Sequence, residues 1–463
     1  RGEILIGNFI APTRPGAGIA DARDAYGETE FYFDLNLRLL QRLKATRAAR
    51  LFDLDRLAAR YGKDRAHQAR MFHLAKMDWS QSFLPTVADE LARHLNAIRG
   101  RTRKCLVVDL DNTLWGGVVG EDGTGGVKIG AGDPVGEAYL ALQQRIRALQ
   151  SRGVILAVCS KNNPEDALAV FDERDEMELK RDDFAEMAIN WEGKPQNLQR
   201  IASALNIGLD SLVFMDDNPA EIAMVEAALP QVETLLLSGD PSTFAGRLDG
   251  LTVFEKSVIL EDDRTKTRQY RENRDRETLR EEIGDLREYL ASLEMRLTIR
   301  PAEEVDLPRL EQLFQKTNQF NLTTRRHARA DLERFMQDPA TELRLFSAAD
   351  RFGAMGIIGA YVLCPAEDED ELEIESFLMS CRAMGRGIET EVMNGIKRRL
   401  LDEAGVSAIR ARFIPTRKNV PVRSFFEEQG FQAIEKDSSG ETMYRLTEEE
   451  CSLTACSWIE VDA

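Results

Sequence analysis

The chain has 463 residues, of which 43% are hydrophobic and 30% are charged, and its formal net charge is −18 at pH 7. This length exceeds what one ordinary hydrophobic core supports, so we expect two or three domains. The negative charge argues against a general nucleic-acid binder and against a protein that binds anionic membranes. The sequence contains no apolar run long enough to span a bilayer and opens with no signal-peptide pattern.

The six cysteines are scattered, with neither metal-ligand spacing nor the pattern of a disulfide-rich protein. We therefore expect reduced thiols in a cytoplasmic protein. The chain begins at Arg1 rather than at methionine, which favours a segment excised from a longer polypeptide.

Residues 1–100 alternate short apolar stretches with amphipathic helical patterns, which predicts a mostly helical segment. Three of the four histidines, His67, His73 and His94, lie in this segment. No recognisable catalytic arrangement surrounds them, so we expect a scaffold here rather than a second active site.

Residues 101–255 contain short β-branched runs separated by stretches of helical periodicity, which indicates buried parallel strands joined by helices. This alternation predicts an α/β domain built on a doubly wound parallel sheet. Ligands of such sheets bind at the carboxyl ends of the strands.

The remaining chain divides into three parts. Residues 256–295 are highly charged and predict a solvated linker helix. Residues 296–445 begin with a strand that leads into a helix and continue with hairpin-like strands, which predicts an α+β domain. Residues 446–463 carry no informative pattern and are expected to form a tail.

Four segments of the α/β domain place polar residues where predicted strands end or the next helix begins. One such segment alone would carry little weight, but four in this order make a chance occurrence improbable. The residues are, in chain order, Asp109 with Asp111, Ser160, Lys194, and Asp216 with Asp217.

This set resembles the four motifs of the haloacid dehalogenase superfamily. The resemblance implies that the Asp109 carboxylate attacks phosphorus and forms an aspartyl-phosphate. Asp111 would protonate the leaving oxygen and then deprotonate water. Ser160 would hydrogen-bond a phosphoryl oxygen, and Lys194 would neutralise charge on the phosphoryl group and the nucleophile.

The same resemblance implies a magnesium ion, which prefers oxygen ligands in octahedral geometry. Its ligands would be the Asp109 carboxylate, the Asp111 backbone carbonyl and Asp217, with Asp216 acting through a bound water. Without the metal, the Asp109 carboxylate would repel the phosphate that it attacks.

The spacing of the motifs leaves no room for a large cap domain. The segment 115–130 is long enough only for a hairpin flap, and the interval from Ser160 to Lys194 is short. We therefore expect a capless site that another domain or a macromolecular partner helps to cover.

The run RAMGRG at 382–387 follows a predicted strand and opens a helix. It resembles the Arg/Gln-x-x-Gly-x-Gly/Ala pattern of the GCN5-related acyltransferase fold, whose backbone N–H groups cradle a pantetheine pyrophosphate. The later run NVPVRSFFEEQGF resembles the closing helix and strand of that fold.

Cys381 directly precedes this run and has two interpretations. A cysteine at a strand end is usually a small buried hydrophobic residue. Alternatively, the following helix N-terminus and Arg382 lower its pKa and make it a thiolate nucleophile. Loop N–H groups could then stabilise the oxyanion of acyl transfer.

Four runs over residues 100–440 together resemble the FkbH-like family of glyceryltransferase/phosphatases that feed polyketide synthases. These runs are DLDNTLWGGVVGEDG, NWEGKPQNL, TNQFNLTTRR and FLMSCRAMGRGIE. The resemblance implies that 1,3-bisphosphoglycerate is the donor and that its phosphates are removed. The glyceryl group would pass through a thioester on Cys381 to the phosphopantetheine thiol of an acyl carrier protein.

The run TNQFNLTTRR at 317–326 is either a polar turn between helices or a substrate-binding segment. His327 beside it could act as a base for Cys381. The candidate substrate-binding residues of the whole chain are Asn162, Asn318, Gln319, Asn321, Arg325, Arg382, Gly385 and Gly387.

A cationic region in the third domain is either a solvated face or a docking surface for an acidic carrier protein. It comprises Lys397, Arg398, Arg399, Arg410, Arg412, Arg417, Lys418 and Arg423.

Members of the FkbH-like family often begin with a segment that resembles SGNH hydrolases. Residues 1–100 carry no serine motif of that kind and are interpreted as a degenerate remnant of it.

Two other functions remain open at this point. The chain could be a stand-alone Mg²⁺-dependent small-molecule phosphatase with a non-catalytic C-terminal domain. It could also be a module that docks carrier proteins without chemistry, although the complete set of motif residues argues against this.

Overall fold

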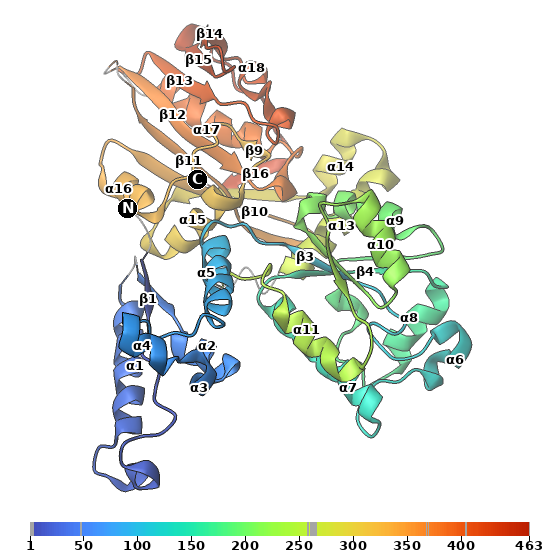
Figure 1. Ribbon diagram of the computed structural model, residues 1–463. Helices are drawn as coiled ribbons and strands as arrows, with labels where there is room; N and C mark the ends of the chain where they lie inside the picture. Colours follow the sequence, from blue (N-terminus) through green and yellow to red (C-terminus); the bar gives the residue numbers. More distant parts are fainter. Residues whose placement is uncertain are drawn as a thin grey trace. The chain divides into compact units, whose positions relative to one another are not determined.

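The computed structural model divides the chain into two compact units, Arg1–Arg101 and Thr102–Ala463 (Figure 1). No helix in the described part of the chain is long and apolar enough to cross a membrane. The described residues are 4–46, 49–256, 259, 266–366, 368, 370–402 and 405–462.

The first unit is mostly helical, as predicted, around one pair of parallel strands. Its small core is formed by Phe52, Leu57 and Phe83 with two alanines. His67 Nδ1 lies 2.6 Å from Asp78 Oδ1. The elements are β1 (Ile4–Gly7), α1 (Glu28–Lys44), β2 (Ala49–Phe52), α2 (Leu54–Tyr61), α3 (Lys63–Ala66), α4 (Ala69–Ala75) and α5 (Leu84–Ile98).

The second unit begins with a five-stranded parallel sheet in the order β5-β4-β3-β6-β7, which confirms the doubly wound α/β prediction. Alternate residues of β3 face opposite helix layers, so both faces of the strand are buried. The strands are β3 (Cys105–Val108), β4 (Ile155–Ser160), β5 (Glu186–Ile189), β6 (Leu212–Asp216) and β7 (Glu233–Leu236).

Two helix layers cover this sheet (Figure 1). One consists of α7 (Pro134–Ser151), α8 (Pro164–Glu173) and α11 (Phe244–Gly250), whose apolar residues pack with Leu106 and Val108. The other consists of α9 (Lys194–Ala204) and α10 (Pro219–Ala228), which pack with Val107.

The segment after β3 forms the expected flap, but with a helix at its tip. An antiparallel bridge joins Gly116 to Lys128, and α6 (Val119–Gly126) lies between them. From β4 to α9, all of which is described, the chain contains only α8, a short 3-10 turn and β5. This part of the chain therefore carries no cap domain.

The second sheet runs in the order β14-β15-β13-β12-β11-β10-β8-β16, and β9 pairs with β12. The strands are β8 (Met295–Pro301), β9 (Phe320–Asn321), β10 (Glu342–Asp350), β11 (Gly353–Pro365), β12 (Glu371–Met379), β13 (Ala408–Phe413), β14 (Gln432–Lys436), β15 (Thr442–Thr447) and β16 (Ile459–Asp462).

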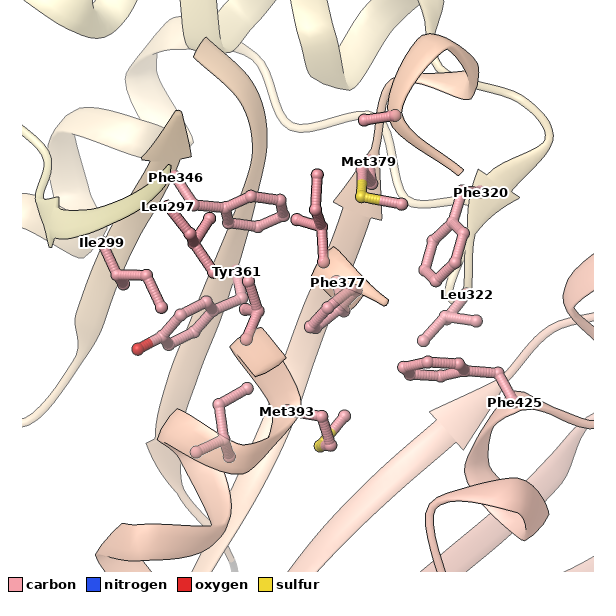
Figure 2. Packing of buried hydrophobic residues seen from close by; sticks show 14 of the residues in the cluster. Leu297, Ile299, Phe320, Leu322, Phe346, Tyr361, Phe377, Met379, Met393 and Phe425 are labelled. Atoms are coloured by element: carbon pink, nitrogen blue, oxygen red, sulfur yellow. The ribbon is translucent and has the colours of Figure 1, made fainter. Parts of the chain in front are cut away.

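Helices cover both faces of this sheet as well. On one face, α17 (Ile388–Asp402) and α18 (Phe425–Glu428) pack on a core that includes Phe346 and Phe377 (Figure 2). On the other face lie α15 (Leu307–Lys316) and α16 (Arg329–Gln337). The predicted α+β domain is thus a single layered unit.

Two expectations about the flanks of this domain differ from the structure. The segment expected as a tail contributes β16, which pairs in parallel with β8, and the expected boundary at 445 falls inside β15. The charged linker contains α13 (Lys266–Ile283) and α14 (Leu286–Ser292). Helix α13 is not a solvated helix, because its Arg276 is only 2% exposed.

The ion pair of Arg276 explains its burial. Its guanidinium donates two hydrogen bonds to the Asp350 carboxylate, at 2.6 and 2.7 Å. Arg274 of the same helix donates to the carbonyl oxygen of Ala185, beside the first sheet. Helix α13 therefore packs against both domains of the second unit.

Candidate active site

The predicted catalytic residues converge at the carboxyl edge of the five-stranded sheet. Asp109 follows β3, Ser160 ends β4 and Asp216 ends β6, and these three strands are neighbours. Lys194 is the first residue of α9, which returns from the same edge. Because parallel strands end together, short segments far apart in sequence form one site.

Lys194 is the central cation of the site and is only 2% exposed. Its Nζ donates to Asp109 Oδ1 at 2.7 Å, to Asp216 Oδ2 at 2.8 Å and to the carbonyl oxygen of Cys159 at 3.0 Å. All three hydrogen bonds that an ammonium can donate are therefore made.

Burial and the charges within the cluster together shift the pKa values of its members. It raises the pKa of Asp109 to about 6, against the opposing effects of the Lys194 charge and of a hydrogen bond from Ser160. Burial opposes the charge of Lys194, but the carboxylates of Asp109 and Asp216 raise its pKa overall. Burial and the charge of Asp216 raise the pKa of Asp217 to about 6.

Three carboxylates could hold a metal ion. Asp109, Asp216 and Asp217 each offer an oxygen, and these atoms lie within 4.8 Å of one another. An all-oxygen donor set with excess negative charge suits a hard divalent cation such as Mg²⁺. The residues present therefore fit the metal that the motifs imply.

Both carboxylate oxygens of Asp216 accept hydrogen bonds within the site. Oδ2 of Asp216 accepts from Lys194, and its Oδ1 accepts from the backbone N–H of Asn218 at 2.8 Å. With both oxygens engaged, Asp216 suits the indirect role expected of it, in which a water connects it to the metal.

The Asp111 carboxylate points toward the flap. Its Oδ1 accepts from the indole N–H of Trp115 at 2.9 Å and from the backbone N–H of Val119 at 3.1 Å. Its Oδ2 accepts from Asn162 Nδ2 at 2.8 Å. Trp115 and Val119 of the flap and Asn162 at the sheet edge thus orient Asp111, the expected acid–base residue.

This geometry gives Asn162 a positioning contact and adds a residue that the motif reasoning missed. The sequence predicts that Asn162 binds substrate, which stays a prediction, and in the structure its amide donates to Asp111 and positions that carboxylate. Trp115 also holds Asp111, although the motif residues do not include it. Its spacing of four residues after Asp111 is the one available signal, and only the fold brings its N–H to the carboxylate.

Cys381 lies in a 3-10 turn, Cys381–Ala383, after β12. Helix α17 begins at Ile388, so the expected helix N-terminus does not adjoin the thiol. The Cys381 thiol donates to the carbonyl oxygen of Asn206 at 3.7 Å, and Asn206 Nδ2 donates to the carbonyl oxygen of Cys381 at 3.4 Å. Cys381 therefore contacts the phosphatase-like domain.

Helix α9 separates the Cys381 thiol from the phosphoryl-transfer cluster. Lys194 starts α9 at the carboxyl edge of the sheet, and Asn206 follows its end at the opposite edge. Eleven residues of α-helix span about 16 Å at about 1.5 Å per residue. Cys381 is thus about one helix length from the carboxylate cluster.

Polar side chains of the 317–326 run form hydrogen bonds and an ion pair with other residues of their own domain. Asn321 is buried, and its Oδ1 accepts from the backbone N–H of Thr324 at 2.8 Å. Arg325 forms an ion pair with Glu375, and Asn318 accepts from Arg326. These contacts favour the polar-turn interpretation over substrate binding.

Two further expectations concern Gln319 of this run and His327 beside it. Gln319 is half-buried in the same turn, and its substrate-binding role stays a prediction. His327 Nε2 lies 2.9 Å from Ser376 Oγ, and its ring packs against Phe314 and Phe335. The structure therefore pairs His327 with Ser376 rather than bringing it to Cys381 as a base.

The glycine loop has the left-handed backbone that its glycines allow, with φ of 73° at Gly385 and 84° at Gly387. The side chain of Arg382 lies outside the described part of the chain.

Much of the cationic region is neutralised by ion pairs. Arg398 pairs with Glu391, and Lys397 is buried. Ion pairs also join Arg399 to Glu342, Arg410 to Glu371 and Asp368, and Arg412 to Glu373 and Glu441. Arg417, Lys418 and Arg423 are exposed, and Lys418 lies 3.6 Å from Asp210.

Comparison with known proteins identifies both domains of the second unit. A family model described as an acetyltransferase (GNAT) domain matches residues 296–432. The N-terminal part of the protein BF1531 from Bacteroides fragilis, a phosphatase-domain structure complexed with Mg, is 35% identical. That match has a TM-score of 0.53 and covers 56% of this chain and 68% of that chain.

Two acetyltransferase structures each match about a third of the chain. One from Thermus thermophilus is 19% identical over 33% of this chain and 97% of its own, with a TM-score of 0.26. Spermidine N-acetyltransferase from Vibrio cholerae is 16% identical over 33% of this chain and 96% of its own, also with a TM-score of 0.26. No curated protein matches the chain.

The chain is therefore a haloacid dehalogenase-like phosphatase domain fused to a GNAT-like acyltransferase domain. It belongs to the same family as the phosphatase-containing part of the Bacteroides fragilis protein.

Proposed function

We propose that the chain is a Mg²⁺-dependent phosphatase coupled to transfer of a glyceryl group, with 1,3-bisphosphoglycerate as the donor. The observation that carries the phosphatase part is the buried cluster in which Lys194 bonds Asp109 and Asp216. Mg²⁺ would be held by Asp109, Asp217 and the Asp111 backbone carbonyl, and Asp216 would contact it through a bound water. When bound, it neutralises charge on the nucleophile and the phosphoryl oxygens.

In the first step, a carboxylate oxygen of Asp109 forms a bond to phosphorus while the bond from phosphorus to the leaving oxygen breaks. Lys194 holds Asp109 Oδ1, so the nucleophile is already oriented before substrate arrives. Asp111 gives its proton to the leaving oxygen, and Ser160 hydrogen-bonds the transferred group.

In the second step, Asp111 takes a proton from water as the water oxygen attacks phosphorus, and the bond between phosphorus and Asp109 breaks. The same carboxylate serves both steps because Trp115 and Asn162 hold it at the flap. Inorganic phosphate leaves, and both aspartates return to their starting state.

The acyl-transfer part rests on the FkbH-like resemblance and on Cys381, a free cysteine that is only partly buried. The thiolate would attack the acyl carbon of the donor and expel the acyl-linked phosphate, leaving a thioester of the glyceryl group that still carries the second phosphate. The phosphopantetheine thiol of an acyl carrier protein would then attack that carbonyl and release Cys381. The remaining phosphate ester is the bond suited to the Asp109 chemistry. We place this reaction in cytoplasmic polyketide biosynthesis.

A stand-alone phosphatase with a non-catalytic C-terminal domain is the second candidate. The hydrogen bond from the Cys381 thiol to Asn206 favours it, because a thiol engaged between two domains needs freeing before it reacts. Asn318, Asn321 and Arg325 contact other residues of their own domain, which also favours the stand-alone phosphatase.

Intact-protein mass spectrometry with 1,3-bisphosphoglycerate and Mg²⁺ separates the two candidates. We expect a glyceryl adduct that maps to Cys381 and disappears when holo-carrier protein is added. Cys381→Ala should lose the adduct and carrier loading while keeping phosphatase activity, and normal carrier loading by this variant would refute the thioester. Cys451→Ala, which removes another partly buried thiol of the same domain, is the matched control and should keep the adduct.

A further inference from the structure

Helix α8 supports the Asp111 carboxylate at its N-terminal end. The helix begins at Pro164, directly after Asn162 and Asn163. Asn162 Nδ2 donates to Asp111 Oδ2 at 2.8 Å, and Asn162 Oδ1 accepts from the backbone N–H of Asn163 at 3.0 Å. The start of α8 therefore orients the amide that holds Asp111.

The middle of α8 supports the same carboxylate through an aromatic pair. Phe171 is 2% exposed, and its ring packs edge-on against Trp115, with the ring centroids 5.6 Å apart. Trp115 is fully buried and donates its indole N–H to Asp111 Oδ1. Because an edge-to-face pair has a preferred geometry, Phe171 restricts the ring that donates to Asp111.

At its C-terminal end, α8 is hydrogen-bonded to the flap through Arg174, the residue that follows Glu173. Arg174 Nη1 donates to the carbonyl oxygens of Thr124 and Val127, each at 3.0 Å, and its Nη2 donates to that of Ile129 at 3.3 Å. A guanidinium presents its donors in a rigid planar fork, so one side chain can hold several carbonyl groups at once.

The flap lacks the internal hydrogen bonds that would otherwise satisfy these carbonyl groups. Helix α6, which lies beside α8 (Figure 1), is interrupted at Gly123, where φ is 67°. The carbonyl groups at the end of a helix have no partner within it. Arg174 supplies donors to this end of the flap, and Thr124 Oγ1 adds a hydrogen bond to Glu173 Oε2 at 2.7 Å.

The position of the flap determines one of the hydrogen bonds to Asp111. Val119 is the first residue of α6, and its backbone N–H donates to Asp111 Oδ1 at 3.1 Å. The two ends of the flap are joined by the bridge between Gly116 and Lys128. Arg174 does not contact Asp111, but it fixes the segment that does.

We propose that Arg174 is a positioning residue for Asp111, which it holds through the flap in the orientation that protonates the leaving oxygen. This inference rests on the proposed phosphatase function. The proton moves from the Asp111 carboxyl group to the leaving oxygen as the bond from that oxygen to phosphorus breaks. A leaving group that departs as a stable anion has little need of that proton, whereas an alkoxide depends on it.

Single-turnover rates with enzyme and Mg²⁺ in excess test this role, with glycerol 3-phosphate and p-nitrophenyl phosphate as substrates. Arg174→Met should slow release of glycerol about tenfold and release of p-nitrophenol less than about twofold, because only the first needs a well-placed acid. Arg174→Lys keeps the charge but places all its donors on one nitrogen. It should show the same selective loss at a smaller size.

Arg181→Met is the matched control, because Arg181 pairs with Asp172 of the same helix and its side chain is 47% exposed. It should leave both rates unchanged. Equal slowing of the two substrates by Arg174→Met would overturn the positioning role, as would the same selective loss in Arg181→Met. If Arg174→Met does not fold, Arg174→Lys decides by the same comparison. Failure of the wild type to release either product would instead refute the proposed phosphatase function.

Discussion

At the scale of single residues, the phosphatase site depends on one ammonium group between two carboxylates. Lys194 is nearly inaccessible to solvent, and so are its partners Asp109 and Asp216. A buried ion pair contributes little when intact relative to an apolar replacement, but removing one partner leaves an uncompensated charge. The site is therefore sensitive to loss of the lysine in stability as well as in catalysis.

Lys194→Met should lower the free energy of unfolding by about 3–5 kcal/mol, the usual cost of breaking a buried pair. The loss should be largest at alkaline pH and shrink as the pH falls. Burial raises the pKa of Asp109 to about 6 although the Lys194 charge lowers it. Without that charge the pKa of Asp109 rises further, so the folded variant keeps a proton that the folded wild type has released. The extra loss of stability therefore grows as the pH rises above about 6.

Urea denaturation between pH 5 and 8, with a chelator present, measures this dependence. Lys161→Met is the control, because Lys161 pairs with Glu221 at the rim and its side chain is 33% exposed. A destabilisation by Lys194→Met that is independent of pH would contradict the electrostatic account.

At the scale of secondary-structure elements, helix α13 contacts one domain of the second unit through Arg274 and the other through Arg276. The Asp350 carboxylate that pairs with it also accepts the backbone N–H of Phe352 at 3.0 Å. The ion pair therefore fixes the turn between β10 and β11 as well as the helix.

Arg276→Met should destabilise the chain by about 3–5 kcal/mol, because it leaves the Asp350 carboxylate buried without its cation. The double variant Arg276→Met/Asp350→Leu should recover part of that loss, since no charge then remains unpaired. Thermal unfolding of both variants measures the difference. Arg268→Met, at an exposed position of the same helix, should have little effect, and a loss as large as that of Arg276→Met would contradict the prediction.

Features that depend on local pattern could be predicted from the sequence, whereas partners that depend on tertiary packing could not. Strands β3, β4 and β6 are short buried runs whose ends carry the motif residues, so local pattern and parallel topology together locate Asp109, Ser160 and Asp216. No local pattern indicates that Arg276 pairs with Asp350 or that Ile459 pairs with Met295. Such partners are set by tertiary packing.

The amide-rich run at 317–326 shows a further limit. Asparagine and arginine side chains serve equally well as ligand contacts and as internal hydrogen-bond partners, so composition does not separate the two uses. Here Asn321 bonds the backbone of its own turn, and Asn419 bonds the carbonyl oxygen of Asn321 at 3.0 Å. Only the three-dimensional contacts distinguish a turn from a binding segment.

At the scale of the second unit, the two candidate chemistries lie at opposite ends of α9. Lys194 opens the helix at the phosphoryl-transfer cluster, and Asn206 contacts Cys381 beyond its other end. A glyceryl donor with a chain of only three carbon atoms cannot reach both groups in one pose, because the helix is about 16 Å long. Phosphate removal and thiol acylation would therefore require separate binding events.

The central claim is that Asp109 is the phosphoryl-accepting nucleophile, and chemical trapping tests it most directly. Rapid quenching of a turnover mixture with borohydride reduces an aspartyl-phosphate to homoserine, which peptide mass spectrometry locates. The account predicts homoserine at position 109 only when Mg²⁺ and a phosphorylated substrate are both present, and no phosphate release by Asp109→Asn. Homoserine at another position, or undiminished phosphate release by Asp109→Asn, would contradict it.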